Sequence, residues 1–307
     1  MNLMSRDLIR VLGVAAALSA IAFCGLFSET HLWVAHVRAE PADDPAREAA
    51  AKARLQSIVK EILSVWDKSD VVCLGEGHGS QNDSDLRIAL VEHQDFVRKV
   101  NAVMVECANI AHQDVLDRFI LGGEDMSREK LRTVWSDANG AEVWESPIYE
   151  AFLRAVRKAN LAVARQKRVR LIAGDNPIER NRGRYIREAV SREILDKGLK
   201  GLAIYGSGHC ECRGGGFPGE LAGKYPGKIW SAFSFYSEDG AREGRRLFGL
   251  GDEPKLIAIS GTEKKKIPIG RMFFLGMYND PATLGDITDA IVYYGNTPDV
   301  VVHPNKK

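Results

Sequence analysis

The sequence predicts an α/β fold: a mostly parallel sheet with helices on both faces and a helical insertion after the second strand. Short apolar runs bounded by Gly, Pro or Asp alternate with longer stretches whose apolar residues recur at helical spacing, an alternation typical of parallel sheets. The chain has 307 residues, and 45% of them are hydrophobic, which is enough to bury a full core. The formal net charge of +1 gives no basic field, so we expect no nucleic-acid partner.

The N-terminus predicts a leader for export. Arg6 and Arg10 precede an uncharged apolar run over residues 11–27, in the order of a signal peptide's charged and apolar regions. The run is long for a signal peptide and just short of a comfortable membrane span, so residues 1–39 are predicted to be either a cleaved signal or an uncleaved anchor. In both cases the rest of the chain faces outward. We expect a protein that is periplasmic or anchored to the outer face of the cytoplasmic membrane, with membrane contact only through this segment.

After the leader, residues 40–52 are predicted to be a linker and residues 53–307 a single domain. The linker is rich in Ala, Pro, Asp and Glu, and the first helix is expected over residues 53–66. Strands are expected where short β-branched or aromatic runs end at Gly, Pro or Asp. These runs are residues 71–74, 102–105, 169–173, 202–205, 229–235, 256–259 and 290–294.

Further helices are expected where apolar residues return every three or four positions. The periodic stretches are residues 86–100, 148–159 and 185–194. Asp83 or Ser84 is expected to cap the first of these, and Pro147 suits the first turn of the second. Residues 113–145 are predicted to be the helical insertion.

The cysteines leave two alternatives open. Outside the apolar run, the chain has Cys73, Cys107, Cys210 and Cys212. An exported protein can oxidise these, and four cysteines permit three pairings; buried free thiols are the other interpretation. The spacing of Cys210 and Cys212 does not fit a zinc ribbon.

Acids and histidines follow the first four predicted strands. Glu76 and His78 follow the first, Glu106 the second, Asp175 the third and His209 the fourth. Ligands of an open parallel sheet bind beyond the carboxyl ends of its strands. We therefore predict that these five side chains meet at one rim and form a functional site.

The loop Gly75-Glu76-Gly77-His78-Gly79 is the strongest single signal. Its three glycines permit tight turns, and a Glu and a His two positions apart can act as a base with its orienting partner, or as two metal ligands. A surface turn that happens to carry charges is the alternative. Gly206-Ser207-Gly208-His209 has the same construction, and it is neither a dinucleotide fingerprint nor a phosphate loop.

The other candidates each have a structural alternative. Glu106 is either a site acid or an ion-pair partner at the sheet edge, and Asp175 either binds the ligand or shapes a turn. Arg87 could bind an oxyanion or pair with Glu106. His112 follows Glu106 and is expected near the rim, where Ser207 offers a hydroxyl; we predict that Asp175, His112 and Ser207 contact the ligand.

Taken together, these motifs resemble one superfamily, which contains the erythromycin-esterase-like proteins, the ChaN haem-binding proteins and the Tiki/TraB proteins. The resemblance runs from about residue 70 to residue 209, and residues 116–160 and 171–177 are most similar to the ChaN branch. It implies an α/β fold with a site at the strand ends. In the esterase-like branch the residues that match Glu76, His78, Glu106 and His209 form the active site, and Arg87 matches an arginine of the same pattern. The single residue between Glu76 and His78 departs from the two that are usual in the esterases and is closer to ChaN.

The expected function is an extracytoplasmic hydrolase acting on an ester, lactone or amide of a small molecule. His78 would be the general base, Glu76 or Glu106 would orient it, and His209 and Arg87 would stabilise the oxyanion. A metal-assisted version would hold Zn²⁺ or Mn²⁺ on Glu76, His78, Glu106 and His209. The alternative, implied by the resemblance, is a haem- or iron-binding protein of the ChaN type without catalysis. The oligomeric state stays open.

Overall fold

A computed structural model describes residues 45–213, 215–235, 238–269 and 282–303. The predicted signal or anchor segment and the predicted linker up to residue 44 lie outside these ranges. Within them, no helix is both long enough and apolar enough to cross a membrane.

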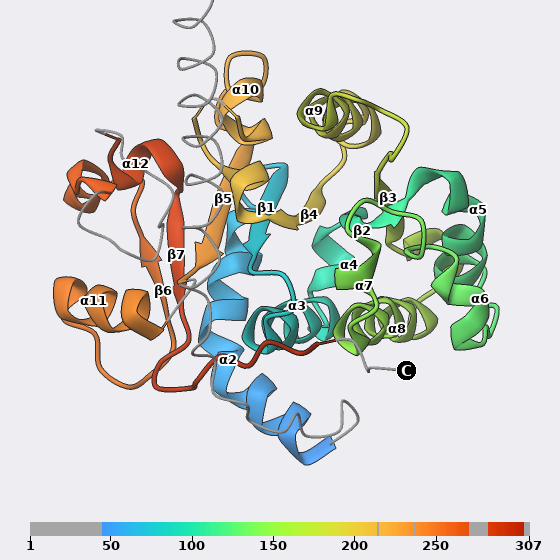
Figure 1. Ribbon diagram of the computed structural model, residues 1–307, viewed down its shortest axis with the longest axis horizontal. Helices are drawn as coiled ribbons and strands as arrows, with labels where there is room; N and C mark the ends of the chain where they lie inside the picture. Colours follow the sequence, from blue (N-terminus) through green and yellow to red (C-terminus); the bar gives the residue numbers. More distant parts are fainter. Residues whose placement is uncertain (1–44, 214, 236–237, 270–281, 304–307) are drawn as a thin grey trace, which may run out of the picture. The chain divides into compact units, whose positions relative to one another are not determined.

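A seven-stranded sheet forms the centre of the described chain, in the order β3-β2-β4-β1-β5-β7-β6 (Figure 1). Neighbouring strands are parallel except β6, which runs antiparallel to β7. This confirms the predicted α/β fold with a mostly parallel sheet. The strands are β1 (Val71–Glu76), β2 (Ala102–Asn109), β3 (Arg170–Asp175), β4 (Gly201–Gly206), β5 (Ile229–Ser234), β6 (Lys255–Ala258) and β7 (Ala290–Tyr293).

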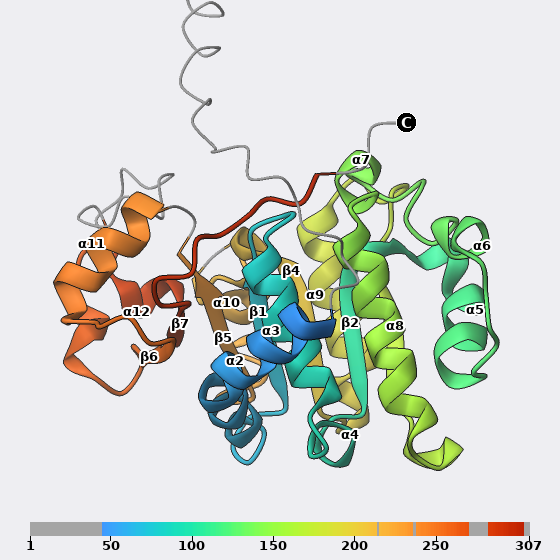
Figure 2. The same cartoon turned by 90° about the horizontal axis from the view of Figure 1, so that it is seen from below.

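Helices cover both faces of the sheet. Successive side chains of a strand point to opposite faces, and in β1 the side chains on both faces are apolar and buried. Val72 and Leu74 of β1 pack with one helical layer, whereas Val71 and Cys73 pack with the other. Figure 2 shows the first layer in front of the sheet. That layer contains α2 (Pro45–Val65), α3 (Gln81–Glu92) and α8 (Pro147–Leu161), and the second contains α9 (Arg182–Glu193) and α10 (Phe217–Leu221).

The predicted helical insertion lies between β2 and α8. Trp135 and Trp144 within it are buried and belong to the same core as α8. Its elements are η1 (Ile110–His112), α5 (Gln113–Leu116), η2 (Asp117–Leu121), α6 (Arg128–Arg132) and α7 (Ala141–Trp144).

A third apolar cluster closes the far end of the sheet, where Phe233, Ile257 and Ile291 pack together. The remaining short elements are α4 (Phe96–Lys99), η3 (Arg165–Lys167), η4 (Leu195–Lys197), η5 (Ser207–Cys210), α11 (Glu238–Phe248), η6 (Glu263–Lys266) and α12 (Leu284–Ile287).

Several predicted boundaries were wrong. The first helix begins at Pro45 rather than residue 53, because the Ala-rich stretch has high helix propensity and Ala51 is already buried. Neither Asp83 nor Ser84 caps α3; the Ser80 hydroxyl accepts the N–H of Asp83 at 3.1 Å. The helix expected over residues 86–100 is divided into α3 and α4. β2 continues to Asn109, so Glu106 lies within that strand rather than after it.

Cys73 and Cys210 form a disulfide that joins β1 to η5, with the Cα atoms 5.8 Å apart. Cys107 and Cys212 are free. The structure therefore contains both open alternatives: one oxidised pair and two thiols.

Candidate functional site

Glu76 and His78 form a hydrogen-bonded pair where β1 ends. His78 Nδ1 lies 3.0 Å from Glu76 Oε1. A carboxylate can only accept, so Nδ1 carries the proton of a neutral imidazole and Nε2 keeps its lone pair. The His78 side chain is 39% exposed, whereas Glu76 is buried. The buried Glu76 carboxylate thus holds the imidazole of His78, and solvent can reach that imidazole.

Tyr149 of α8 fixes the same carboxylate oxygen. Its hydroxyl donates to Glu76 Oε1 at 3.0 Å and accepts the backbone N–H of Gly79 at 3.1 Å. One side chain from the opposite helix therefore ties the carboxylate to the loop that carries His78. Gly79 has a φ of 84°, a conformation that glycine adopts without strain.

Arg87 supports Glu76 from the protein interior. Its guanidinium forms an ion pair with Glu76 Oε2 and lies over the rings of Tyr149 and Phe152, at 5.2 and 5.7 Å from their centroids. Arg87 is buried, so it acts on the site through Glu76. This corrects two expectations: its partner is Glu76 rather than Glu106, and it does not face a substrate oxyanion.

The C-terminal segment crosses the same loop (Figure 2). Val302 N–H donates to the Gly79 carbonyl at 2.8 Å, and Gln81 N–H donates to the Val300 carbonyl at 3.0 Å. Ser146, just before α8, donates its hydroxyl to the Val302 carbonyl at 2.6 Å. The loop is therefore held by chain segments more than 200 positions apart in the sequence.

Glu106 is the second buried carboxylate of the rim. Its Oε2 accepts the backbone N–H of Gly206, and its Oε1 lies 2.7 Å from Arg182 Nη2 and 3.6 Å from His209 Nε2. Glu106 is therefore an ion-pair partner that also lies near the rim histidine, and its role as a site acid stays a prediction. Arg182 was not predicted from the sequence; the available signal was an arginine beside a capping Asn181 soon after the third strand.

Asp175 lies beyond Arg182 at the end of β3. Its Oδ1 is 3.3 Å from Arg182 Nε, and it accepts the backbone N–H of Asn139 at 2.8 Å and the Asn139 side-chain amide at 3.0 Å. Asp175 is buried. It therefore links the helical insertion to α9 rather than offering a free carboxylate to a ligand.

The space around Gly206 shows that His78 and Glu106 lie close together. A Cβ atom on Gly206 would lie 3.1 Å from His78 Nε2 and 3.5 Å from Glu106 Oε2. His78, which follows β1, and Glu106, which lies within β2, thus meet across one glycine of β4. His209, 28% exposed, lies on the other side of the Glu106 carboxylate.

Two predicted ligand-binding residues have other contacts. His112 lies on η1, where its Nε2 is 3.1 Å from Asp137 Oδ2. Ser207 is buried, and its hydroxyl donates to the Glu76 carbonyl at 3.3 Å. His112 is therefore not brought to the rim by these contacts, and Ser207 supports the backbone.

Both rim histidines are kept neutral by their surroundings. Burial is the main cause that holds the pKa of His78 below its usual value of 6.5, and Arg182 adds to it while Glu106 and Asp83 oppose it. Burial likewise lowers the pKa of His209, with Glu106 opposing and Arg182 contributing. At neutral pH both imidazoles can accept a proton.

Asp83 is a buried acid that the sequence suggested only as a helix cap. Its Oδ2 accepts the N–H of Gly77 at 2.9 Å, and its Oδ1 accepts the hydroxyls of Ser234 and Tyr294 at 2.8 Å each. Burial, followed by the nearby Asp299 carboxylate, raises the pKa of Asp83 to about 6. Asp83 therefore joins the functional loop to β5 and to the residue after β7.

The predicted metal set is not arranged as a metal centre. Across the described ranges, no group of three or more His, Cys, Asp or Glu side chains is placed to hold an ion. The physical reason is visible at the carboxylates, because Arg87 pairs with Glu76 and Arg182 pairs with Glu106. Two guanidinium groups already supply the positive charge that a cation would bring.

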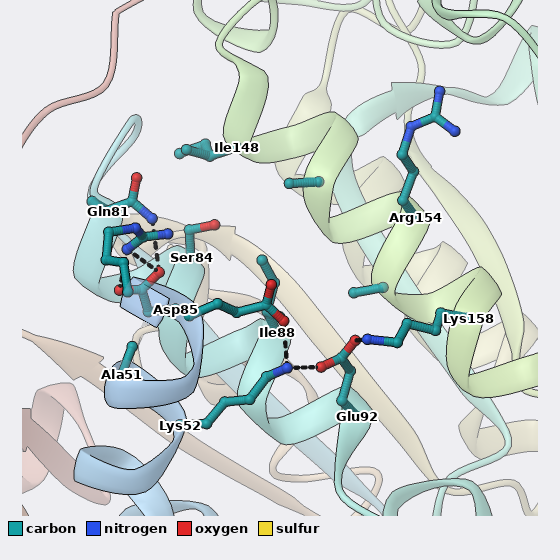
Figure 3. Close-up of a pocket in the computed structure, with 14 residues that line it drawn as sticks. Ala51, Lys52, Gln81, Ser84, Asp85, Ile88, Glu92, Ile148, Arg154 and Lys158 are labelled. Carbon is teal, nitrogen blue, oxygen red and sulfur yellow. Dashed lines mark hydrogen bonds and ion pairs between the residues drawn. The ribbon is translucent and has the colours of Figure 1, made fainter. Parts of the chain in front are cut away.

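A separate groove lies between α2, α3 and α8 (Figure 3). Glu92 binds both Lys52 and Lys158 along it, and Asp85 binds Arg47. These side chains pair with one another, and none of the predicted site residues lines this groove.

Comparisons with known proteins agree with the predicted resemblance. Residues 62–180 match the family model described as "Haem-binding uptake, Tiki superfamily, ChaN". No curated protein matches the sequence. A crystal structure of a Bacillus cereus protein is similar over 83% of this chain and 99% of its own, with 11% identity and a TM-score of 0.53, which shows the fold alone.

Two further solved structures are similar at lower scores. One shows cofacial heme binding to ChaN of Campylobacter jejuni, with 18% identity, a TM-score of 0.38, and coverage of 60% of this chain and 86% of that one. The other is an erythromycin esterase mutant in its open conformation, with 10% identity, a TM-score of 0.44, and coverage of 79% and 95%.

Proposed function

We propose that this chain belongs to the haem-binding uptake, Tiki superfamily, whose model matches residues 62–180, and that its rim hydrolyses an ester, lactone or amide bond in a small molecule, with His78 as the general base. One observation carries the proposal. Glu76 fixes His78 Nδ1 at 3.0 Å, so Nε2 of a partly exposed imidazole is left to meet a substrate. This is the geometry of a base with its orienting acid.

The chemistry follows from that pair. His78 Nε2 takes a proton from water while the water oxygen attacks the carbonyl carbon. The imidazolium that forms is stabilised by Glu76, whose carboxylate is already held by Tyr149 and Arg87. Because these partners are in place beforehand, little reorganisation is needed when the charge appears.

His209 is the second partly exposed histidine of the rim, and we assign it the role of hydrogen-bond donor. A neutral imidazole with an N–H can donate to the carbonyl oxygen as negative charge develops on it, or to the leaving group. The expectation placed Arg87 beside His209 in this role. Since Arg87 is buried behind Glu76, we assign the donation to His209 alone.

A panel of esters, lactones and amides tests the proposal. His78→Ala and Glu76→Gln should each lower kcat by roughly 10²–10⁴-fold on any substrate that the wild type cleaves. Lys158→Ala, at an exposed position of the separate groove, is the control and should keep the wild-type rate. Equal rates for wild type and His78→Ala would reject the catalytic assignment.

Haem binding is the second candidate, and the description of the matching family favours it. An imidazole whose Nδ1–H is held by a carboxylate is also the usual form of a metal-ligating histidine, so His78 would be the residue that holds the haem iron. A haemin titration of wild type and His78→Ala measures it. The absence of a Soret shift at micromolar protein would reject this candidate, and a shift that survives His78→Ala would reject His78 as the ligand.

We also propose an extracytoplasmic location. The buried Cys73–Cys210 disulfide supports it, because such bonds persist in oxidising compartments, and the family description refers to haem uptake. A fusion of residues 1–44 to a reporter that is active only after export tests the predicted leader. A reporter that stays inactive would contradict the export signal.

A further inference from the structure

An arginine and a histidine share one oxygen of the Glu106 carboxylate. Arg182 Nη2 lies 2.7 Å from Glu106 Oε1, and His209 Nε2 lies 3.6 Å from the same atom. The other oxygen accepts the backbone N–H of Gly206. One Glu106 oxygen thus accepts the backbone N–H, and on the other oxygen Arg182 makes the shorter contact.

Arg182 is itself fixed in position. It opens α9 directly after the N-cap Asn181, and its Nε lies 3.3 Å from Asp175 Oδ1. Asp175 in turn is held by the backbone and side-chain N–H groups of Asn139. A planar guanidinium can contact two carboxylates from one position, whereas a lysine ammonium is a single point charge. The side chain is 32% exposed, so it lies at the open side of the rim.

We infer that Arg182 is a positioning residue: it keeps the Glu106 carboxylate on its own guanidinium and so prevents that carboxylate from closing onto His209. Without Arg182, Glu106 would be a buried carboxylate with only a backbone donor, and His209 is the next side chain within reach that can become cationic. A carboxylate in close contact with an imidazole favours the imidazolium. The catalytic part of this inference rests on the proposed function. The effect of Arg182 on Glu106 and His209 can be measured without a substrate.

The groups that face His209 set the direction of the effect. Burial is the main cause that lowers the pKa of His209. Among its charged neighbours, two raise this pKa and two lower it further. Those that raise it are Glu106 and Asp175, and those that lower it are Arg182 and His78. On α10, which packs against the same loop, Glu220 is already paired with Arg187. Loss of Arg182 therefore removes one positive charge that lowers the pKa of His209. It also frees the Glu106 carboxylate, which raises that pKa.

An NMR titration of the His209 imidazole tests the inference on the full chain. In Arg182→Gln, the His209 midpoint should move upward by about one pH unit, the size expected when an opposite charge comes into contact. Arg184→Gln is the matched control, because Arg184 lies on the same helical turn and pairs with Glu179 at the surface. Its His209 titration should equal that of the wild type.

The same titration in a Glu106→Gln background separates positioning from simple charge. If Arg182 acts through Glu106, adding Arg182→Gln to Glu106→Gln should give much less than the single-variant shift. An equal shift in both backgrounds, or no shift in either, would overturn the inference. Should Arg182→Gln fail to fold, Arg182→Lys decides: one ammonium cannot hold both Asp175 and Glu106, so a smaller upward shift is expected, and an unchanged midpoint in the folded variant would overturn it.

Discussion

At the scale of single residues, the Tyr149 hydroxyl joins the Glu76 carboxylate to the loop that carries His78. It donates to Glu76 Oε1 and accepts the Gly79 N–H, and burial raises the pKa of the phenol, so it remains a donor. Tyr149→Phe leaves a buried N–H without its acceptor, and we expect a loss of about 1–3 kcal/mol in the free energy of unfolding. Urea unfolding measures this loss.

Tyr185→Phe is the control for that change. Within the described part of the chain, the buried Tyr185 hydroxyl oxygen makes no hydrogen bond, so its removal should alter the unfolding free energy by less than about 0.5 kcal/mol. A Tyr149→Phe effect equally small would contradict the importance of the two bonds.

Asp83 makes stability depend on pH in an unusual direction. Burial and Asp299 raise its pKa from 3.8 to about 6, so the folded state binds the proton more tightly than the unfolded one. Through this group, the free energy of unfolding falls as the pH rises from about 4 to about 6. Asp299→Asn removes the second negative charge, so the Asp83 midpoint should fall below 6 and part of the stability at pH 7 should return.

Carboxyl carbon NMR and urea unfolding at acidic and neutral pH measure the two consequences of Asp299→Asn. The Ser80 hydroxyl donates to Asp299 Oδ1 in the wild type, and the amide oxygen of the introduced asparagine can still accept it. The variant therefore changes charge more than contacts. An Asp83 midpoint that does not move would show that burial alone sets it.

The rim acids and histidines were predictable, but their partners were not. Glu76, Glu106 and His209 could be placed because parallel strands bring their carboxyl ends to one edge. The partner of Arg87 depends on which way α3 is rotated about its axis, and one helical position changes that direction by about 100°. Tyr149 reaches the site only because α8 packs beside α3, a contact that the local sequence does not determine.

At the scale of elements, the Cys73–Cys210 disulfide ties β1 to η5 next to His209. The bond closes a loop with a sequence separation of 137 residues, for which chain entropy predicts about 5 kcal/mol of stabilisation. We expect the free energy of unfolding of Cys73→Ala/Cys210→Ala to fall by this order. In this variant the segment that carries His209 has no covalent connection to β1. Urea unfolding with and without reductant, on the wild type and this variant, measures both.

Cys212→Ala is the matched control for the disulfide, since Cys212 is a free thiol two positions away. Burial raises the pKa of this thiol, which disfavours exchange with the disulfide. The control should keep the wild-type sensitivity to reductant. A wild type in which alkylation under denaturing, non-reducing conditions labels both Cys73 and Cys210 would contradict the bond.

Strand positions were predicted more accurately than helix ends. β-branched runs bounded by Gly, Pro or Asp coincide with all seven strands of the described sheet. The start of α3 depended instead on whether Ser80, Asp83 or Ser84 turns its side chain toward a free backbone N–H. The start of α2 at Pro45 depended on packing that a composition rich in Ala and acids does not show.

At the scale of the whole molecule, the loops that form the rim are held by contacts with several other elements. The loop after β1 is bonded to α8 and to the C-terminal segment, and the loop after β4 is bonded to β1 through a disulfide. Such support from several elements is what a pre-organised catalytic site needs. It also means that burial, which lowers the pKa of both histidines, is a property of the assembled fold.

The pH dependence of the proposed hydrolysis should therefore reflect the effect of burial on the pKa of His78. The active form of His78 is neutral, and its pKa is held below 6.5, so the midpoint of the acid limb of kcat/KM should lie below pH 6.5. A profile recorded at constant ionic strength, with intrinsic fluorescence to detect acid unfolding, measures this. In Arg182→Gln, the loss of a neighbouring positive charge should move the acid limb upward, because Arg182 also lowers the pKa of His78. A wild-type limb at or above pH 6.5 would mean that water reaches His78 freely or that another group is the base.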